Sequence, residues 1–270
     1  MALIRAFEAS ASDIELTLLE SAGSIHIVNA IQEGHADVGF AFADVAYMAF
    51  SGRLTRHPFH RLRGVAALQP NAFHFLVGRD SPIRSLADLR GRRVSVGMPG
   101  SGSAVAARLV LSSFGIDLDA VRFDSTPARE AAHEIRPGQI DAMLVMATDP
   151  YDPVTIATEA GARLLPIAGP AVDRLRRDSP FVHLTTIPEN TYRGQPSRIH
   201  TIGIDSVLIC RSDLDDSVVY QLTKQFFDTL PSLVPAETSL RLIDLSRVDA
   251  TPIPLHRGAT RYYRERELSR

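Results

Sequence analysis

The sequence contains a single cysteine and no long apolar run, and each shortage excludes a class of protein. Because Cys210 has no second cysteine to pair with among the 270 residues, an internal disulfide is excluded. Cys210 lies in the strand-like run VLICR, where a free thiol is expected to be buried and inert. No apolar run approaches the roughly 18 residues that span a bilayer, so we expect no direct insertion into a membrane.

Neither sign of charge is in excess. The chain has 29 Lys and Arg against 31 Asp and Glu, a net charge of −2, so nothing in the bulk charge favours a nucleic-acid partner. With 45% hydrophobic and 22% charged residues, the composition is that of an ordinary soluble globular protein. The length is sufficient for one large core or for two lobes.

What the sequence does contain is a steady alternation of strand and helix patterns. This alternation predicts an α/β fold with a mainly parallel sheet. Strands are expected over residues 14–21, 38–42, 65–70, 72–79, 94–96, 122–125, 141–147, 163–169 and within 200–213. Helices are expected over residues 2–10, 22–33, from about 44, 85–90, from about 104, 127–135, 153–160, 171–179 and 217–233.

Two extended segments, 72–81 and 200–213, bracket a self-contained α/β set. Two such crossings predict two lobes with a ligand cleft between them. Lobe I is expected to comprise residues 1–79 and 204–270, and lobe II residues 80–203. Ligands of open α/β sheets bind beyond the carboxyl ends of the strands, so the expected site faces this cleft.

The most informative local pattern is a Gly/Pro/Ser turn, residues 97–103, between a strand and an Ala/Leu/Val-rich helix. The first amides of such a helix have no intrahelical acceptor, and the helix dipole adds positive charge there, which favours a carboxylate or phosphate. Ser101, Gly102 and Ser103 are therefore candidate ligand-binding residues. An ordinary helix start capped by a serine is the alternative.

Three related motifs match this turn poorly. Ser103 stands where a nucleotide-binding P-loop requires Lys, so a nucleotide triphosphatase is not expected. Val105 replaces the third glycine of a dinucleotide fingerprint. Pro99 removes the G-x-S-x-G context of a nucleophilic serine. No nucleotide cofactor is therefore expected.

The histidines do not form a metal pattern. His57 and His60 share a loop with several arginines, and a metal site would need more ligands and less positive charge nearby. We expect no metal and no cofactor. His74 and His133 are the candidates for a general base if the protein is an enzyme.

Four blocks of sequence point to a known family: ADVGFAFADVAYMAFSG (36–52), HFLVGRDSPIRSLADLRGRRVSVGMPGSGS (74–103), GQIDAMLVMA (138–147) and PIPLHRGATRYYRE (252–265). In these blocks the chain resembles the extracytoplasmic solute receptors of the TAXI subfamily of tripartite (TRAP) transporters. The resemblance implies a two-lobed type II periplasmic-binding-protein fold and no catalysis. It further implies a periplasmic receptor that delivers a small carboxylate, such as glutamate, glutamine or a related dicarboxylate, to the membrane subunits of a TRAP-type transporter.

Within that fold, five further residues are candidate ligand contacts. Phe42, Asp44, Thr126 and Thr148 lie at or just beyond the end of an expected strand, and Tyr47 lies one helical turn past Asp44, where it is expected to line the cleft. Asp44 is expected to face the cleft and receive a ligand ammonium, or to cap the helix that it begins. The two threonines are expected to donate hydroxyls to the ligand, or to cap turns.

The resemblance is incomplete at the start of the chain. Members of the subfamily begin with a signal peptide, a first strand and a Gly-rich, Tyr-containing turn, and none of these precedes Ala2. A missing strand is expected to leave a sheet edge open. Without a signal peptide the chain is expected in the cytoplasm if its start is native. An enzyme of the same fold, related to pyrimidine-precursor synthases, and a cytoplasmic ligand sensor remain the alternatives.

Overall fold

The computed structural model describes residues 14–135, 139–235 and 237–268. It consists of two compact units, one of Met1–Pro70 with Asp205–Arg270 and the other of Asn71–Ile204; we call them unit 1 and unit 2. The division falls inside two long strands, β2 (Leu62–Val77) and β8 (Ile199–Arg211). The sequence places the first boundary after residue 79, just beyond the end of β2, whereas the units divide within this strand. The apolar pattern of β2 shows no break at the point of division.

Unit 1 is built around the strand order β1-β8-β2. Its other elements are α2 (Ser24–Glu33), β1 (Val38–Phe42), α3 (Ala43–Phe50), α8 (Asp216–Leu233), η3 (Thr238–Leu242) and α9 (Arg257–Leu268). α2 ends as expected at Gly34, whose φ of 82° is the left-handed conformation that glycine adopts most easily. β1 pairs antiparallel with β8 and, among the described residues, with no other strand, so its outer edge is open.

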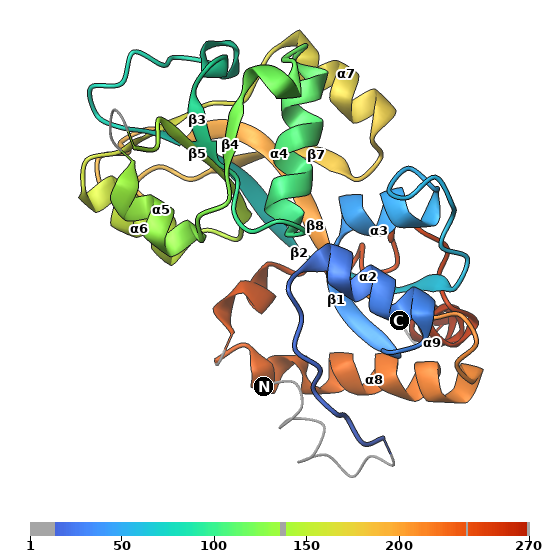
Figure 1. The fold of residues 1–270 in the computed structure, drawn as a ribbon. Coiled ribbons are helices and arrows are strands. Elements are labelled where there is room, and N and C mark those ends of the chain that lie inside the picture. Colours follow the sequence, from blue (N-terminus) through green and yellow to red (C-terminus); the bar gives the residue numbers. More distant parts are fainter. Residues whose placement is uncertain (1–13, 136–138, 236, 269–270) are drawn as a thin grey trace. The chain divides into compact units, whose positions relative to one another are not determined.

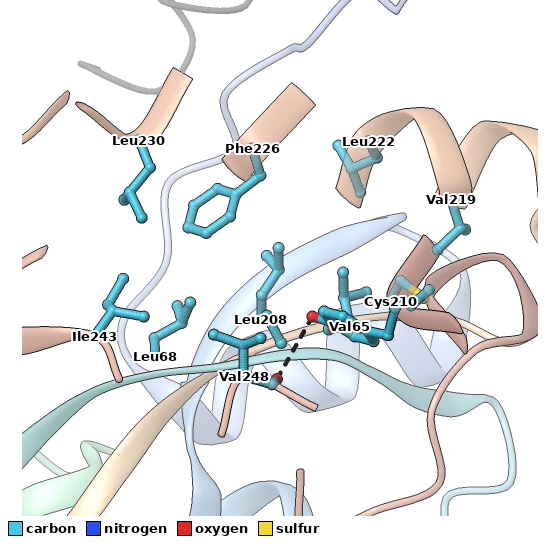
Figure 2. Packing of buried hydrophobic residues seen from close by; sticks show 13 residues of the cluster. Val65, Leu68, Leu208, Cys210, Val219, Leu222, Phe226, Leu230, Ile243 and Val248 are labelled. Carbon is cyan, nitrogen blue, oxygen red and sulfur yellow. Dashed lines mark hydrogen bonds between the residues drawn. The ribbon is translucent and has the colours of Figure 1, made fainter. Parts of the chain in front are cut away.

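The core of unit 1 joins these strands to the amphipathic helix α8 and to α9. Figure 2 shows Val65, Leu208 and Cys210 of the strands facing side chains of α8 such as Phe226 and Leu230. Cys210 is fully buried, and burial raises the pKa of its thiol to about 12. A thiol held protonated in this way is unreactive, as its sequence context predicts.

Unit 2 holds the other strands and helices. They are η1 (Leu86–Leu89), β3 (Arg93–Ser95), α4 (Gly102–Ser113), η2 (Leu118–Ala120), β4 (Arg122–Asp124), α5 (Ala128–Glu134), β5 (Ala142–Ala147), α6 (Asp152–Glu159), β6 (Arg163–Leu165), α7 (Pro170–Asp178) and β7 (Val182–Ile187). The strand order is β2-β5-β3-β4, with β6 on β2 and β7 on β8. In Figure 1, α5 and α6 are neighbouring helices of this unit, and they pack on each other.

Several expectations about the fold are wrong. The sheet is mixed rather than mainly parallel: β3 pairs in parallel with β4 and β5, whereas β2 pairs antiparallel with β5 and β6, and β8 pairs antiparallel with β1 and β7. Residues 65–70 and 72–79 are not two strands, since Pro70 lies within the single strand β2.

Residues 14–21 have strand-like alternation but form no strand. Ile14 and Leu16 of this segment instead pack against the core of unit 1, and Leu18 and Leu19 are each 56% exposed. The helix expected over residues 2–10 lies outside the described residues.

Candidate functional site

The Gly-rich turn of unit 2 links β3 to α4, as the sequence predicts. Gly97 and Gly100 have φ angles of 81° and 80°, a conformation that glycine adopts without strain. Ser101 caps α4: its Oγ accepts a hydrogen bond from the N–H of Ala104 at 3.2 Å. The helix begins at Gly102, two residues before the expected start, because this cap closes the first turn.

The cap leaves the N–H groups of Gly102 and Ser103 without an intrahelical acceptor. The hydroxyl of Ser103 is engaged, however. It accepts a hydrogen bond from the N–H of Met146 at 3.1 Å and donates to the carbonyl of Met146 at 3.3 Å. Ser103 thus holds the start of α4 against β5, and an anion at this turn would meet backbone amides and the Ser101 hydroxyl.

Three parallel strands bring the other unit 2 candidates to the same edge. β3, β4 and β5 run in one direction, so the Gly-rich turn, Thr126 and Thr148 all follow carboxyl ends at one edge of the sheet. A hydrogen bond of 3.4 Å from the Ser95 hydroxyl to the carbonyl of Thr126 ties two of these ends together. The structure therefore brings these residues to one edge of the sheet, while their role as ligand contacts stays a prediction.

Both threonines also have local partners. The N–H of Thr126 donates to Asp124 Oδ1 at 2.8 Å, which is a turn-capping contact. The Thr148 hydroxyl donates to Asn71 Oδ1 at 3.1 Å, and Asn71 in turn donates to the carbonyl of Ile204 at 3.1 Å. Each threonine is half-buried, so each retains exposed surface at this edge.

A groove that sequence reasoning missed lies elsewhere in unit 2. Its volume is about 500 Å³, and it is lined by Ile167, Ala168, Gly169, Val172, Asp173, Leu184, Thr185, Thr186, His200 and Thr201. The groove follows β6 and opens at the start of α7. The local sequence signal for this groove is the Gly169-Pro170 pair, which is typical of a helix start. The strand β7, which forms one wall of the groove, carries no clear strand pattern in the sequence.

The candidates of unit 1 surround the junction of β1 and α3. The N–H of Phe42 donates to Ser24 Oγ at 3.1 Å, so Phe42 and the start of α2 are joined. Tyr47 is half-buried, with the guanidinium of Arg53 5.4 Å from the centre of its ring. Both residues retain some exposed surface.

Asp44 is different, because it has no exposed surface. Its Oδ1 accepts a hydrogen bond from the N–H of Val45 at 2.8 Å, while Oδ2 is buried without a hydrogen-bond partner among the described residues. Burial removes the carboxylate from water and raises the pKa of Asp44 from 3.8 to about 7. In this arrangement no ligand ammonium reaches the carboxyl group, and its role as a ligand contact stays a prediction.

Neither of the two candidate general bases, His74 and His133, has a described contact with a serine or cysteine nucleophile. His74 is fully buried, its Nδ1 lies 3.0 Å from the carbonyl of Ala72, and its Nε2 lies 2.9 Å from the Tyr192 hydroxyl. Burial lowers the pKa of His74 to about 4, so the ring is neutral. His133 is exposed on α5, and no described contact joins it to a nucleophile. In the described part of the chain no cluster of three or more His, Cys, Asp or Glu side chains is placed to hold a metal.

The fold is that of the periplasmic binding proteins. XAC2383 from Xanthomonas citri, in a structure bound to ATP, superposes with a TM-score of 0.59 at 14% identity, over 97% of this chain and 91% of that one. CAE31940 from Bordetella bronchiseptica RB50 gives 0.58 at 16% identity, over 98% and 92%. The alkanesulfonate-binding protein SsuA from Xanthomonas axonopodis pv. citri, bound to MOPS, gives 0.52 at 18% identity, over 97% and 75%.

The chain belongs to the NMT1-like family, whose sequence pattern it matches over residues 1–266. This assignment agrees with the expected class of fold. Membership of the NMT1-like family does not by itself show the TAXI subfamily, a TRAP-type transporter or a carboxylate ligand. No helix in the described ranges is both long and apolar enough to cross a membrane.

Proposed function

We propose that the protein is a non-catalytic solute-binding receptor that takes up a small carboxylate, with the Gly-rich turn of unit 2 as its anion site. The observation that carries this proposal is the pair of amides at Gly102 and Ser103, which lack an intrahelical acceptor, at the shared carboxyl edge of β3, β4 and β5. Hydrogen bonds from such amides to an anion are charge-assisted and about twice as strong as neutral ones.

The residues around the turn have separate roles in this proposal. The amides of Gly102 and Ser103 and the hydroxyl of Ser101 donate to the carboxylate. The Ser103 hydroxyl fixes the start of α4 on Met146, so the donors are held in place before the ligand arrives. Thr126 and Thr148 flank the bound group. Pre-positioned donors cost little ordering entropy on binding, which favours affinity.

We further propose that the receptor acts outside the cytoplasm and delivers its ligand to the membrane subunits of a TRAP-type transporter. The four sequence blocks that resemble TAXI receptors support the transporter class, and membership of the NMT1-like family is compatible with it. Glutamate, glutamine and 2-oxoglutarate are the first ligands to test. A sulfonate is the necessary comparison, because it offers an anion of different shape to the same amides.

The test follows the melting temperature during titration with each compound. A true ligand at one hundred times its Kd stabilises the folded protein by about 2.7 kcal/mol. We expect at least one carboxylate to raise the melting temperature by an amount that corresponds to this stabilisation. The matched compound, in which an amide or an alcohol replaces the carboxylate, should not raise it. Flat curves across a broad carboxylate panel contradict the proposal.

The variant Gly102→Pro localises the effect. Proline at the first helical position lacks only an N–H that the helix does not use, and the preceding Ser101 has φ −69° and ψ 150°, which proline tolerates in its neighbour. The variant should therefore fold with a similar melting temperature but lose most of the ligand-induced shift. Matched Gly102→Ala keeps the amide and should keep the shift.

A further inference from the structure

Unit 1 carries a polar furrow at the starts of α8 and α9, away from the Gly-rich turn in the sequence and in a different unit. One part, of about 540 Å³, is lined by Arg63, Ser212, Leu214, Asp215, Asp216, Leu255, His256 and Arg257. A second part, of about 490 Å³, is lined by Arg257, Thr260, Arg261, Arg264 and Glu265. Arg257 lines both parts, and we refer to the two parts together as the furrow.

Three arginines point out from α9 along this furrow. Arg257, Arg261 and Arg264 are all exposed and lie at helical spacings of four and three, so they share one face of the helix. Like charges at these spacings repel and destabilise an isolated helix. Such an arrangement is favourable when an acidic partner neutralises it.

The charges of this face are unequally compensated inside the molecule. Arg261 is paired with Glu265 at 2.9 Å. Arg257 and Arg264 make no ion pair with any residue of the described ranges. Two guanidinium groups about 10 Å apart along the helix axis, at 1.5 Å per residue, are therefore available to another molecule.

The first part of the furrow also carries two acidic side chains, Asp215 and Asp216, beside Arg63 and Arg257. Asp215 is occupied, since its Oδ1 accepts a hydrogen bond from the N–H of Ser217 at 2.7 Å and caps α8. The side chain of Asp216 is 57% exposed, and its nearest basic group is the buried ring of His256 at 3.7 Å. Burial lowers the pKa of His256, which favours the neutral form of the ring beside the exposed Asp216.

We propose that this furrow is the docking surface for an acidic segment of a partner protein. Acidic side chains of the segment pair with Arg257 and Arg264, and one basic side chain at its end pairs with Asp216. Complementary charges of this kind fix orientation and speed association. The surface is independent of the proposed carboxylate site, because the two belong to different units.

The test measures fluorescence anisotropy of a labelled Glu-rich peptide with one terminal Lys, added to the full chain at low and at physiological salt. The charge-reversed peptide, Lys-rich with one Glu, is the second probe. We expect the acidic peptide to bind and its affinity to fall as salt rises. In the double variant Arg257→Glu, Arg264→Glu the affinity should drop at least about tenfold, and the charge-reversed peptide should now bind.

The matched control is Arg174→Glu, Arg177→Glu on α7 of unit 2, where two exposed arginines receive the same charge change. This control should bind the acidic peptide like the unaltered chain. No binding of the acidic peptide, or an equal loss in both double variants, overturns the proposal. Sedimentation with vesicles of anionic phospholipid that requires Arg257 and Arg264, without peptide binding, also overturns it in favour of a membrane surface.

Discussion

The buried carboxyl group of Asp44 makes the stability of unit 1 depend on pH, and Asp44→Asn should remove that dependence. The side chain has no exposed surface, one of its oxygens lacks a partner among the described residues, and its pKa rises from 3.8 to about 7. Because the folded-state pKa is raised, the folded protein binds more protons than the unfolded chain between these values. Stability is then full at low pH and is lost as pH rises through about 4 to 7.

The magnitude follows from the size of the shift. A change from 3.8 to about 7 is roughly three pKa units, and at 1.36 kcal/mol per unit the group costs about 4 kcal/mol at pH 8. About 3 kcal/mol of this cost develops between pH 5 and pH 8. The Asn variant carries a different, constant cost of about 1–3 kcal/mol for its buried amide, and this offset does not change with pH.

The assay is urea unfolding at pH 5, 6.5 and 8, followed by far-ultraviolet circular dichroism. The free energy of unfolding of Asp44→Asn minus that of the unaltered chain should rise by about 3 kcal/mol from pH 5 to pH 8. Glu267→Gln, an exposed acid of α9 in the same unit, is the control and should give a flat difference. A difference for Asp44→Asn that stays constant with pH within about 0.5 kcal/mol refutes the reasoning.

Three further substitutions test the packing inside unit 1 or inside unit 2, and each effect is measured by urea unfolding. Gly258→Ala should destabilise by about 1–3 kcal/mol, because a Cβ there would overlap backbone atoms of α8; a neutral effect would contradict the close approach of α8 and α9. Tyr192→Phe should cost about 1–3 kcal/mol, since its hydroxyl bonds the buried ring of His74, and the pKa of His74 measured by NMR should change with it. Ser103→Ala should cost about 1 kcal/mol by removing the bonds to Met146, yet retain carboxylate binding; loss of binding with unchanged stability would assign the hydroxyl to the ligand instead.

The parts of the fold set by local sequence signals were predictable. Ser101 caps α4 and Gly34 ends α2 as expected, because caps depend on residues within one turn of each other. β1 has the expected bounds, Val38–Phe42, since its apolar run is short and bounded on both sides. These signals are read directly from neighbouring residues.

Other features depend on partners far away in the sequence, and local patterns do not reveal them. Residues 14–21 alternate like a strand but find no neighbouring strand to pair with in the described structure. The second role of Ser103 comes from Met146 of β5, and that distant contact is invisible in the turn itself. β2 and β8 pair antiparallel with other strands, so the sheet is mixed, a property of topology rather than of periodicity.

The candidate site likewise combines features that the sequence predicts with features that it does not. The Gly-rich turn, Thr126 and Thr148 lie at one edge because parallel strands have their carboxyl ends at the same edge of a sheet. The order of the strands in the sequence was therefore enough to predict this edge. The burial of Asp44 did not follow, because burial depends on tertiary packing that neighbouring residues in the sequence do not reveal. The groove beside α7 was missed because β7 carries no strong strand pattern.

Backbone NMR of the ¹⁵N-labelled protein tests the central claim most directly, by following amide shifts as glutamate, glutamine or 2-oxoglutarate is added. We expect the amides of Gly102 and Ser103 to move downfield and saturate together, with a Kd equal to that found by calorimetry. The amide of Ala104, already bonded to Ser101, should move less. Saturable binding that leaves Gly102 and Ser103 unmoved would contradict the claim that this turn receives the ligand.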